Sequence, residues 1–281
     1  MDFVRSFVAD TALVPVIVSA IVAAALFSVK RFARCSGAVA LACGFFAGWA
    51  SQDWATLTPA RYLDWLPYCA AALGLVAVAA AIGLPRWAFL SLGIVCCIAA
   101  TWLLVPSFPK LQPPRFQAIA MIAGTSAAMF ILLEQMTKQI GTRTLIACLM
   151  VTGTAAALVL QQSFGMKFAQ IMGMLTASLA GAFLFARNKP DETSMGVPLI
   201  FTTLVANLMF IGNANSTSDV PVYSFAVVPC IPAALWLVAS ANRKDNRTWL
   251  KLAGFALFGL LIVSAVYPAI MAHPPWEDME H

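Results

Sequence analysis

The chain has 281 residues, of which 61% are hydrophobic and 10% are charged, and its formal net charge is +5. Soluble domains are about 45–50% apolar and about 25% charged, so this composition excludes an ordinary water-soluble globular protein. Basic residues at the inner face of a membrane account for the positive charge, and no nucleic-acid partner is needed to explain it.

Apolar stretches of about 17–24 residues, separated by short polar connections, account for nearly all of the chain, and each is long enough to cross a bilayer as an α-helix. We therefore predict an all-α integral membrane protein with about ten transmembrane helices, in a single polytopic membrane domain over residues 1–281. The predicted spans are Thr11 to Val29, Cys35 to Ser51, Leu66 to Leu84, Ala88 to Phe108, Phe116 to Met136, Thr144 to Gly165, Phe168 to Arg187, Gly196 to Asn213, Val220 to Ser240 and Trp249 to Ala272.

The basic residues are unevenly divided between the two sides of these spans, with twelve on one side and five on the other. Because short cytoplasmic loops carry an excess of Lys and Arg, the richer side is expected to be cytoplasmic. We predict a multi-pass protein of a cell membrane, of the bacterial inner-membrane type, with both termini on the non-cytoplasmic side. The richer side holds Lys30, Arg31, Arg34, Arg86, Lys138, Arg143, Arg187, Lys189, Arg243, Lys244, Arg247 and Lys251, and the poorer side holds Arg5, Arg61, Lys110, Arg115 and Lys167.

The connections are too short to build a soluble core, so functional residues are expected within the bundle or at its two faces. We expect the first apolar stretch to remain as a span rather than to be removed as a signal peptide. Met1 to Asp10 lacks a positively charged region, and Lys30 follows the stretch directly. Aromatic residues such as Trp54 and Trp65 near the first outer connection are typical of the headgroup boundary.

The charged, cysteine and histidine residues of the sequence do not predict a catalytic or metal-binding site. Within the spans, the single carboxylate considered for function is Glu134, which an ordinary helical pair with Lys138 explains. The seven cysteines lie in or beside apolar spans without a C-x-x-C pair, and the His-containing tail, 273–281, has no metal-ligand spacing. We predict no enzyme activity, no catalytic residue, no cofactor and no metal.

Neutral polar side chains near mid-membrane are the remaining candidates for a solute site. Asn207 lies near the centre of the eighth span, and Thr152 and Thr154 lie in the middle of the sixth. An Asn side chain in hydrocarbon requires hydrogen-bond partners, so it is expected to face the interior of the bundle. These residues are explained equally by hydrogen bonding between helices. Asn213, near an outer end, could line a vestibule.

The ninth span carries Pro229 and Pro232 at mid-membrane. Each proline lacks a backbone donor and clashes with the preceding turn, so the pair is expected to bend or break the helix. Broken helices are tolerated where protein or a cavity surrounds them, and transporters build sites from them. A packing kink without a site is the other interpretation.

An internal similarity links the fourth and ninth spans. Residues 97–107 and 230–240 are identical at six of eleven positions without a gap, at an offset of 133. This offset maps each span onto the fifth span after it, and because five is odd the second half would cross the bilayer in the opposite sense. The similarity therefore favours two inverted five-helix repeats, with halves 11–136 and 144–272. In that arrangement Thr101 and Trp102 would face the segment from Pro229 to Ala234 at the midplane. Chance similarity between apolar segments is the other interpretation.

Two functions from different classes follow. The first is a small secondary permease for a neutral or weakly polar solute, with candidate solute-binding residues Asn207, Pro229, Pro232, Thr101, Thr152 and Thr154. Its layout of ten short-looped spans is similar to that of small drug/metabolite permeases, although no family motif is present. The second is a non-catalytic membrane subunit that stabilises a larger complex or binds lipid, with membrane proteins or a second copy as partners.

A cavity distinguishes these two functions. A polar cavity that reaches mid-depth beside Pro229 and Asn207 would favour transport. A solid apolar interior with grooves that face the lipid would favour the subunit.

Overall fold

The computed structural model describes residues 9–29, 31–52, 54–56, 58–108, 111–163, 165–186, 194–243 and 248–272. Within these residues the chain is all-helical and contains ten segments that are long and apolar enough to cross a membrane, as predicted. Several basic residues used above, including Lys30, Lys110 and Lys189, and the tail from 273 onward, lie outside the described residues.

The observed helical segments agree with the predicted spans to within about one helical turn at each end. The ninth segment is divided into three elements. In chain order the elements are η1 (Ala9–Leu13), α2 (Val14–Ser28), η2 (Ala33–Cys35), α3 (Ser36–Ala50), η3 (Tyr62–Trp65), α4 (Leu66–Ile82), α5 (Arg86–Leu104), α6 (Arg115–Met136), α7 (Thr142–Gln162), α8 (Met166–Phe185), α9 (Val197–Ala214), α10 (Val222–Val227), η4 (Val228–Ala234), α11 (Leu235–Arg243) and α12 (Thr248–Met271).

Local residues explain several helix ends. Pro67 and Pro198 lie in the first turns of α4 and α9, where the missing backbone donor costs no helical hydrogen bond. Gly83 ends α4 with φ of 130°, a conformation that residues with a Cβ rarely adopt. The short connection from Gly83 to Pro85 then leads into α5, which packs back against α4.

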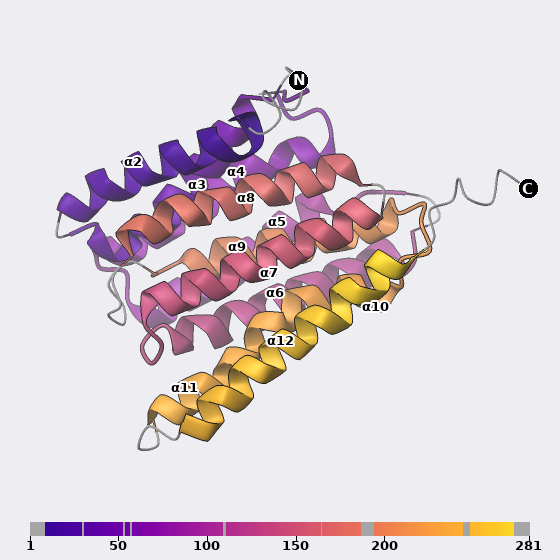
Figure 1. The fold of residues 1–281 in the computed structure, drawn as a ribbon. Helices are drawn as coiled ribbons and strands as arrows, with labels where there is room; N and C mark the ends of the chain where they lie inside the picture. Colours follow the sequence, from indigo (N-terminus) through magenta and orange to yellow (C-terminus); the bar gives the residue numbers. More distant parts are fainter. Residues whose placement is uncertain are drawn as a thin grey trace, which may run out of the picture.

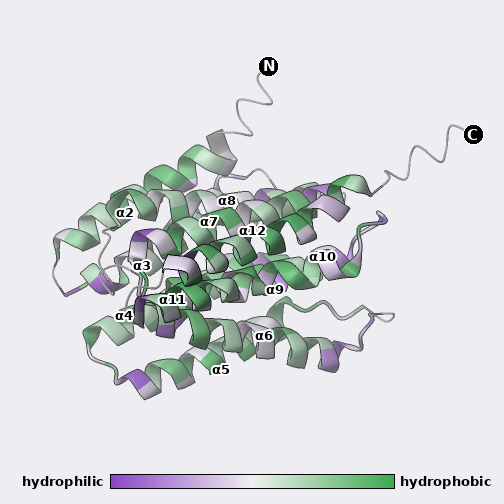
Figure 2. Cartoon of the chain, turned by 60° about the horizontal axis from the view of Figure 1, so that its bottom comes forward, coloured by the Kyte–Doolittle hydropathy of each residue, from purple (hydrophilic) through white to green (hydrophobic). Residues whose placement is uncertain are grey.

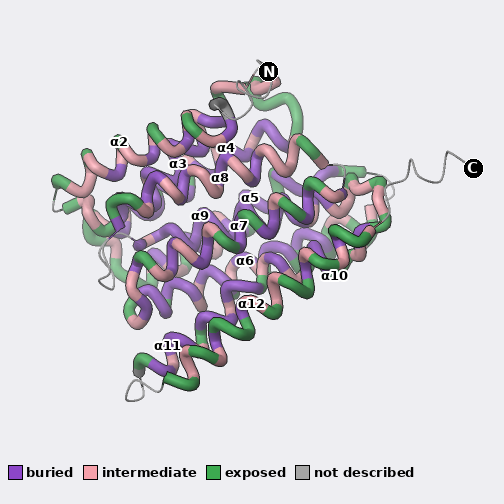
Figure 3. The backbone as a smooth tube through the Cα atoms, in the orientation of Figure 1, coloured by how far each residue is buried: buried purple, intermediate pink, exposed green. Residues whose placement is uncertain are grey.

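Helix α9 is the centre of the molecule. It is surrounded by α3, α4, α5, α6, the α10–η4 segment, α7 and α8, and successive members of this ring pack against one another (Figure 1). Helix α2 lies outside the ring against α3 and α8, and α12 lies outside it against α7 and the ninth segment. In Figure 3, α9 is mostly buried, whereas α2 and α12 are largely intermediate or exposed. Among the ten spans, α9 is thus the one most fully enclosed by protein.

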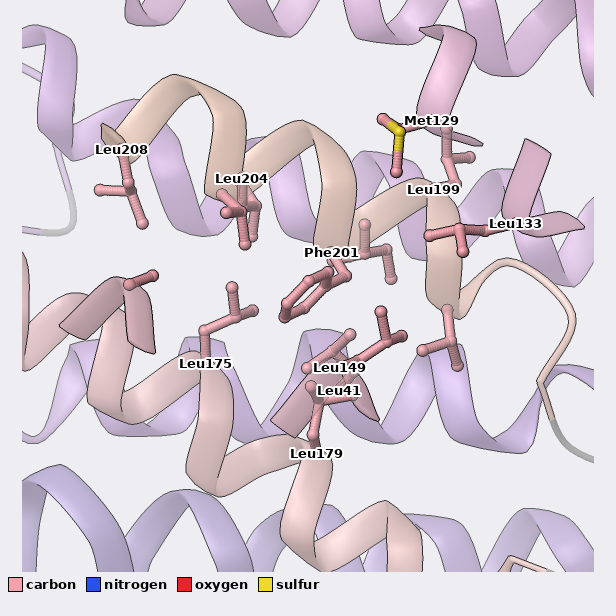
Figure 4. Close-up of a cluster of buried hydrophobic side chains, with 14 of the residues drawn as sticks. Leu41, Met129, Leu133, Leu149, Leu175, Leu179, Leu199, Phe201, Leu204 and Leu208 are labelled. Carbon is pink, nitrogen blue, oxygen red and sulfur yellow. The ribbon is translucent and has the colours of Figure 1, made fainter. Parts of the chain in front are cut away.

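The interior around α9 is filled by apolar side chains from several helices. Figure 4 shows Phe201, Leu204 and Leu208 of α9 among leucines of α3, α7 and α8. All three α9 side chains are at most 1% exposed. The centre of the bundle is therefore filled with buried apolar side chains along this face of α9.

Helices α2, α3 and α8 approach one another at small residues. Gly44 of α3 and Gly181 of α8 both face Ser19 of α2 so closely that a Cβ added at either would lie 2.8 Å from the Ser19 Cβ. The Ser19 hydroxyl donates a hydrogen bond of 2.6 Å to the carbonyl of Ser178. Small residues allow this close packing, which is a common way for helices to associate in lipid.

The two ends of the bundle differ in charge. The first helix begins and the last helix ends at the same end of the bundle (Figure 1), and hydrophilic residues gather at the helix ends and connections (Figure 2). The opposite end, which we call the basic end, holds Arg31, Arg34, Arg86, Lys138, Arg143 and Lys251 among the described side chains. The end at which α2 begins, the far end, holds Arg61, Arg115 and Lys167.

Several contacts between the helices depart from the predicted inverted repeat, which the structure does not confirm. Helix α2, the first span, packs extensively against α8, the seventh, but the symmetry-related pair of α3 and α7 has no comparable contact in the described residues. Likewise α6 packs against α9, whereas α12 and α4 have no comparable contact in the part of the chain that the structure describes. In the described residues, the fourth and ninth spans also lack the expected approach, because α6 and α9 lie between α5 and the ninth segment.

Candidate functional site

Asn207 lies on α9 at the contact with α5 and has no solvent exposure, as expected for an Asn at membrane depth. Its side-chain Nδ2 donates to the Thr101 hydroxyl at 3.2 Å and to the carbonyl of Thr203 at 2.8 Å. One turn earlier, the Thr203 hydroxyl lies 3.2 Å from the Sγ atom of Cys97. Both pairs have the same sequence separation of 106, so α5 and α9 run parallel and are joined twice in register.

This polar contact is sealed by protein. Thr101, Thr203 and Cys97 also have no exposure, and Asn207 Oδ1 has no hydrogen-bond partner among the described residues. Thr101 therefore contacts α9 rather than the segment from Pro229 to Ala234, because the Asn207 amide occupies the space beside it. Trp102, which was expected to face that segment as well, is 52% exposed and stacks with the Arg115 guanidinium at 5.1 Å.

Thr152 and Thr154 of α7 face different surroundings, although they are two residues apart. Thr152 is buried and donates a hydrogen bond to the Cys148 carbonyl at 2.9 Å, whereas Thr154 is exposed and donates to the Met150 carbonyl at 3.0 Å. Each hydroxyl is thus satisfied by the carbonyl four residues earlier in its own helix. Neither residue contacts Asn207, Pro229 or Pro232 through a hydrogen bond in the described part of the chain.

The ninth segment is broken where the two prolines predicted it. An α-helical start, α10, gives way to the 3-10 helix η4, which contains Pro232, and α-helix resumes in α11. Pro232 is buried and Pro229 is half-buried. Segment η4 packs against α6, α7, α9 and α12, so neighbouring helices surround the backbone groups that the prolines leave free.

A groove of about 290 Å³ lies beside this break, between α6, α9 and the α10–η4 segment. We call it the α6–α9–α10 groove. Pro229 lines it, but Asn207, Thr101, Thr152, Thr154 and Pro232 do not. The lining residues are Gln112, Pro113, Ala118, Met121, Ile122, Thr125, Ala206, Phe210, Asn213, Val222, Phe225, Ala226, Pro229 and Cys230.

The groove opens on the outer surface of the bundle. Met121 and Val222 on its two sides are 64% and 66% exposed. Both belong to apolar segments long enough to span a membrane, α6 and the ninth segment. In the other direction, Ala206 and Ile122 close the groove against the packed interior, and they are 5% and 7% exposed.

The predicted solute-binding residues are thus divided among separate places. Pro229 lines the groove, Asn207 and Thr101 join α9 to α5, and Thr152 and Thr154 belong to α7. Asn213, expected to line a vestibule, does line the groove. Sequence reasoning missed Phe210, Ala118 and the other apolar lining residues because nothing in their local pattern marks them as neighbours across three elements.

Among the described residues, no group of three or more His, Cys, Asp or Glu side chains is placed to hold a metal ion. The described Asp, Glu, Lys, Arg and His side chains do not line the groove. Comparison of the chain with protein-family models, with curated proteins and with solved structures gave no match.

Proposed function

We propose that this chain is an integral membrane protein that binds a lipid in the α6–α9–α10 groove and acts without catalysis, as a structural or stabilising membrane subunit. The single observation that supports this function best is the shape and chemistry of the groove. It is lined mainly by apolar side chains, it opens sideways on the apolar surface, and it is separate from the sealed polar contact at Asn207.

The outer surface supports insertion in a bilayer. Large apolar side chains on α4, α5 and α12 are exposed along the helices, among them Leu75 at 68%, Trp87 at 73% and Leu260 at 64%. Exposed apolar surface of this extent is unfavourable in water and favourable against lipid. The ten segments supply the length that the hydrocarbon core requires.

The charge difference between the two ends supports an orientation. The basic end would face the cytoplasm, which would place both termini on the non-cytoplasmic side of a membrane of the bacterial inner-membrane type. The α6–α9–α10 groove then opens in the outer leaflet, because Asn213 lies near the far end of α9 and Gln112 lies in the connection that precedes α6.

The two buried carboxylates among the described side chains lie far apart, which supports a function without catalysis. Asp64 lies at the far end, where its Oδ2 accepts hydrogen bonds from the backbone of Ala60 and Arg61. Glu134 lies near the opposite end of the bundle, in the last turn of α6. The two side chains are therefore separated by most of the length of the bundle and do not form a pair for acid and base chemistry.

Lipid retained during purification tests this function. We expect native mass spectrometry of the protein in mild detergent to show about one bound lipid per chain. Ala226→Trp, which places a large ring in the groove, should reduce the bound fraction several-fold, while Ala256→Trp on the exposed surface of α12 should not. Equal lipid retention in both variants would contradict the groove as the binding site.

The broken ninth segment favours a second candidate function, a small permease for a neutral or weakly polar solute. Its 3-10 turn lines the groove through Pro229, and such breaks can rearrange during transport. Stopped-flow light scattering of proteoliposomes with glycerol or urea should then show faster solute entry than protein-free liposomes do, and Pro229→Ala should slow it. Identical rates with and without the protein would count against this candidate.

A further inference from the structure

The α6–α9–α10 groove changes in polarity along its depth. At its outer end lie the carboxamides of Gln112 and Asn213, one in the connection before α6 and one near the end of α9. At its inner end lie Ala206, Thr125 and Cys230, near the middle of their spans. An amphiphile with its polar head toward the membrane surface would match this gradient.

The dimensions of the groove correspond to one hydrocarbon chain. Ala206 and Asn213 are seven residues apart on α9, which is roughly 10 Å along the helix axis at about 1.5 Å per residue. That length covers about two-thirds of the roughly 15 Å thickness of one leaflet's hydrocarbon. At about 10–15 Å³ of cavity volume for each water-sized group, a groove of about 290 Å³ accommodates roughly 20–30 heavy atoms, which is the size of a single-chain amphiphile. A phospholipid with two full acyl chains is larger than this.

The head of the ligand should be uncharged. No described Asp, Glu, Lys, Arg or His side chain lines the groove. Arg115 begins α6 nearby, but its guanidinium donates to the Trp102 carbonyl at 3.1 Å and stacks on the Trp102 ring, on the side of α5. The two carboxamides offer both donors and acceptors, which suits hydroxyl, ester or amide groups.

We infer that the groove binds a neutral single-chain amphiphile from the outer leaflet, with its hydroxylated head at Asn213 and Gln112 and its chain directed toward Ala206. This inference rests on the proposed lipid-binding function and specifies its ligand class. A phospholipid with two chains exceeds the space in the groove, and among the described residues an anionic fatty acid meets no Lys, Arg or His side chain in its lining. A monoacylglycerol has the required chain and head.

Competition binding on the full chain in detergent micelles tests the ligand class. A fluorescent monoacylglycerol serves as the probe, with unlabelled monoacylglycerol, the fatty acid of equal chain length and phosphatidylcholine as competitors. We expect the unlabelled monoacylglycerol to compete roughly tenfold better than either other lipid, a ratio of the size that one hydrogen bond between the head and a carboxamide can produce. Equal competition by the fatty acid or by phosphatidylcholine would overturn the inference while leaving lipid binding intact.

Two substitutions test the direction of the ligand. Asn213→Leu should weaken monoacylglycerol binding by roughly fivefold because it removes a hydrogen-bonding group at the head, and Asn213→Gln should retain most of the affinity. Cys230→Phe should shorten the inner end and shift the preference toward shorter chains. Unchanged affinity in Asn213→Leu together with unchanged chain preference in Cys230→Phe would overturn the orientation.

Failure of the proposed function gives a different result. The probe is tested at concentrations below its critical micelle concentration. If it does not bind the wild-type chain there, and no lipid is retained on purification, both the proposed lipid-binding function and this inference are wrong. The competition panel uses the wild-type chain, so its result does not depend on whether a variant folds. Thermal unfolding without ligand identifies any variant that has lost its structure.

Discussion

Gly181→Ala should loosen the packing of α2 against α8. A Cβ at Gly181 would lie 2.8 Å from the Ser19 Cβ and 2.9 Å from the Ala20 nitrogen, and it would also overlap the Val16 carbonyl oxygen. These are backbone atoms and a Cβ, so no side-chain rotation removes the clash. Helix α2 packs against α3 and α8 and lies outside the ring, so it must move away as a unit.

The expected magnitude follows from two opposing effects. Overpacking of this kind costs up to about 3 kcal/mol, and replacing Gly by Ala in a helix returns about 1 kcal/mol of propensity. The net destabilisation should be about 2 kcal/mol. Gly259→Ala on α12 is the matched control, because a Cβ there meets nothing within 4 Å. We expect this control to be unchanged or more stable by up to about 1 kcal/mol.

Reversible unfolding in mixed detergent micelles, followed by tryptophan fluorescence, measures both variants. The folded fraction of Gly181→Ala should fall at lower denaturant than that of the wild type, and that of Gly259→Ala should not. If Gly181→Ala proves as stable as the wild type, the close approach of α2 to α8 is incorrect. A loss of stability of the same size in both variants would instead indicate a general effect of methyl groups in these helices.

Three further predictions concern other parts of the molecule. Asn207→Leu should change the free energy of unfolding by less than about 1 kcal/mol. It removes a hydrogen bond worth about 0.6 kcal/mol, but it also removes a buried oxygen without a partner among the described residues. A loss above about 2 kcal/mol would contradict this reasoning. A cysteine at Arg61 should react with an impermeant maleimide from outside intact cells, and one at Arg86 only after permeabilisation; the opposite pattern would invert the proposed orientation. Thr152→Trp should destabilise the fold by more than about 2 kcal/mol, because Thr152 is buried, and Thr154→Trp should be nearly neutral, because Thr154 is exposed. Equal stability of the two variants would show that the surroundings of Thr152 and Thr154 are alike.

The proline pair shows how far local sequence reasoning reaches. Pro229 and Pro232 predicted a break because a proline disturbs the turn that precedes it, and η4 is found there. Which helices pack against η4 depends on segments that are distant in the sequence. The prediction that Thr101 faces this region was wrong, because α6 and α9 separate α5 from it and Asn207 occupies the space beside the Thr101 hydroxyl.

Asn207 itself was expected to face the interior, since an amide cannot face hydrocarbon without partners, and it is fully buried. Its partner could not be read from the sequence. Thr152 and Thr154 illustrate the same limit, because residues two apart on a helix point to different sides and the sequence did not indicate which side of α7 is inside.

The sequence alone determined the number, length and approximate ends of the ten helical segments, because hydropathy and helix length are local properties that a bilayer-sized segment must satisfy. The tertiary structure alone decided that α9 is central, that Gly44 and Gly181 meet Ser19, and that Asn213 and Pro229 line one groove. The physical reason is that these helices are apolar on every side. Without an amphipathic stripe to set each helix's rotation, close packing of small residues and a few polar contacts between distant segments set it instead.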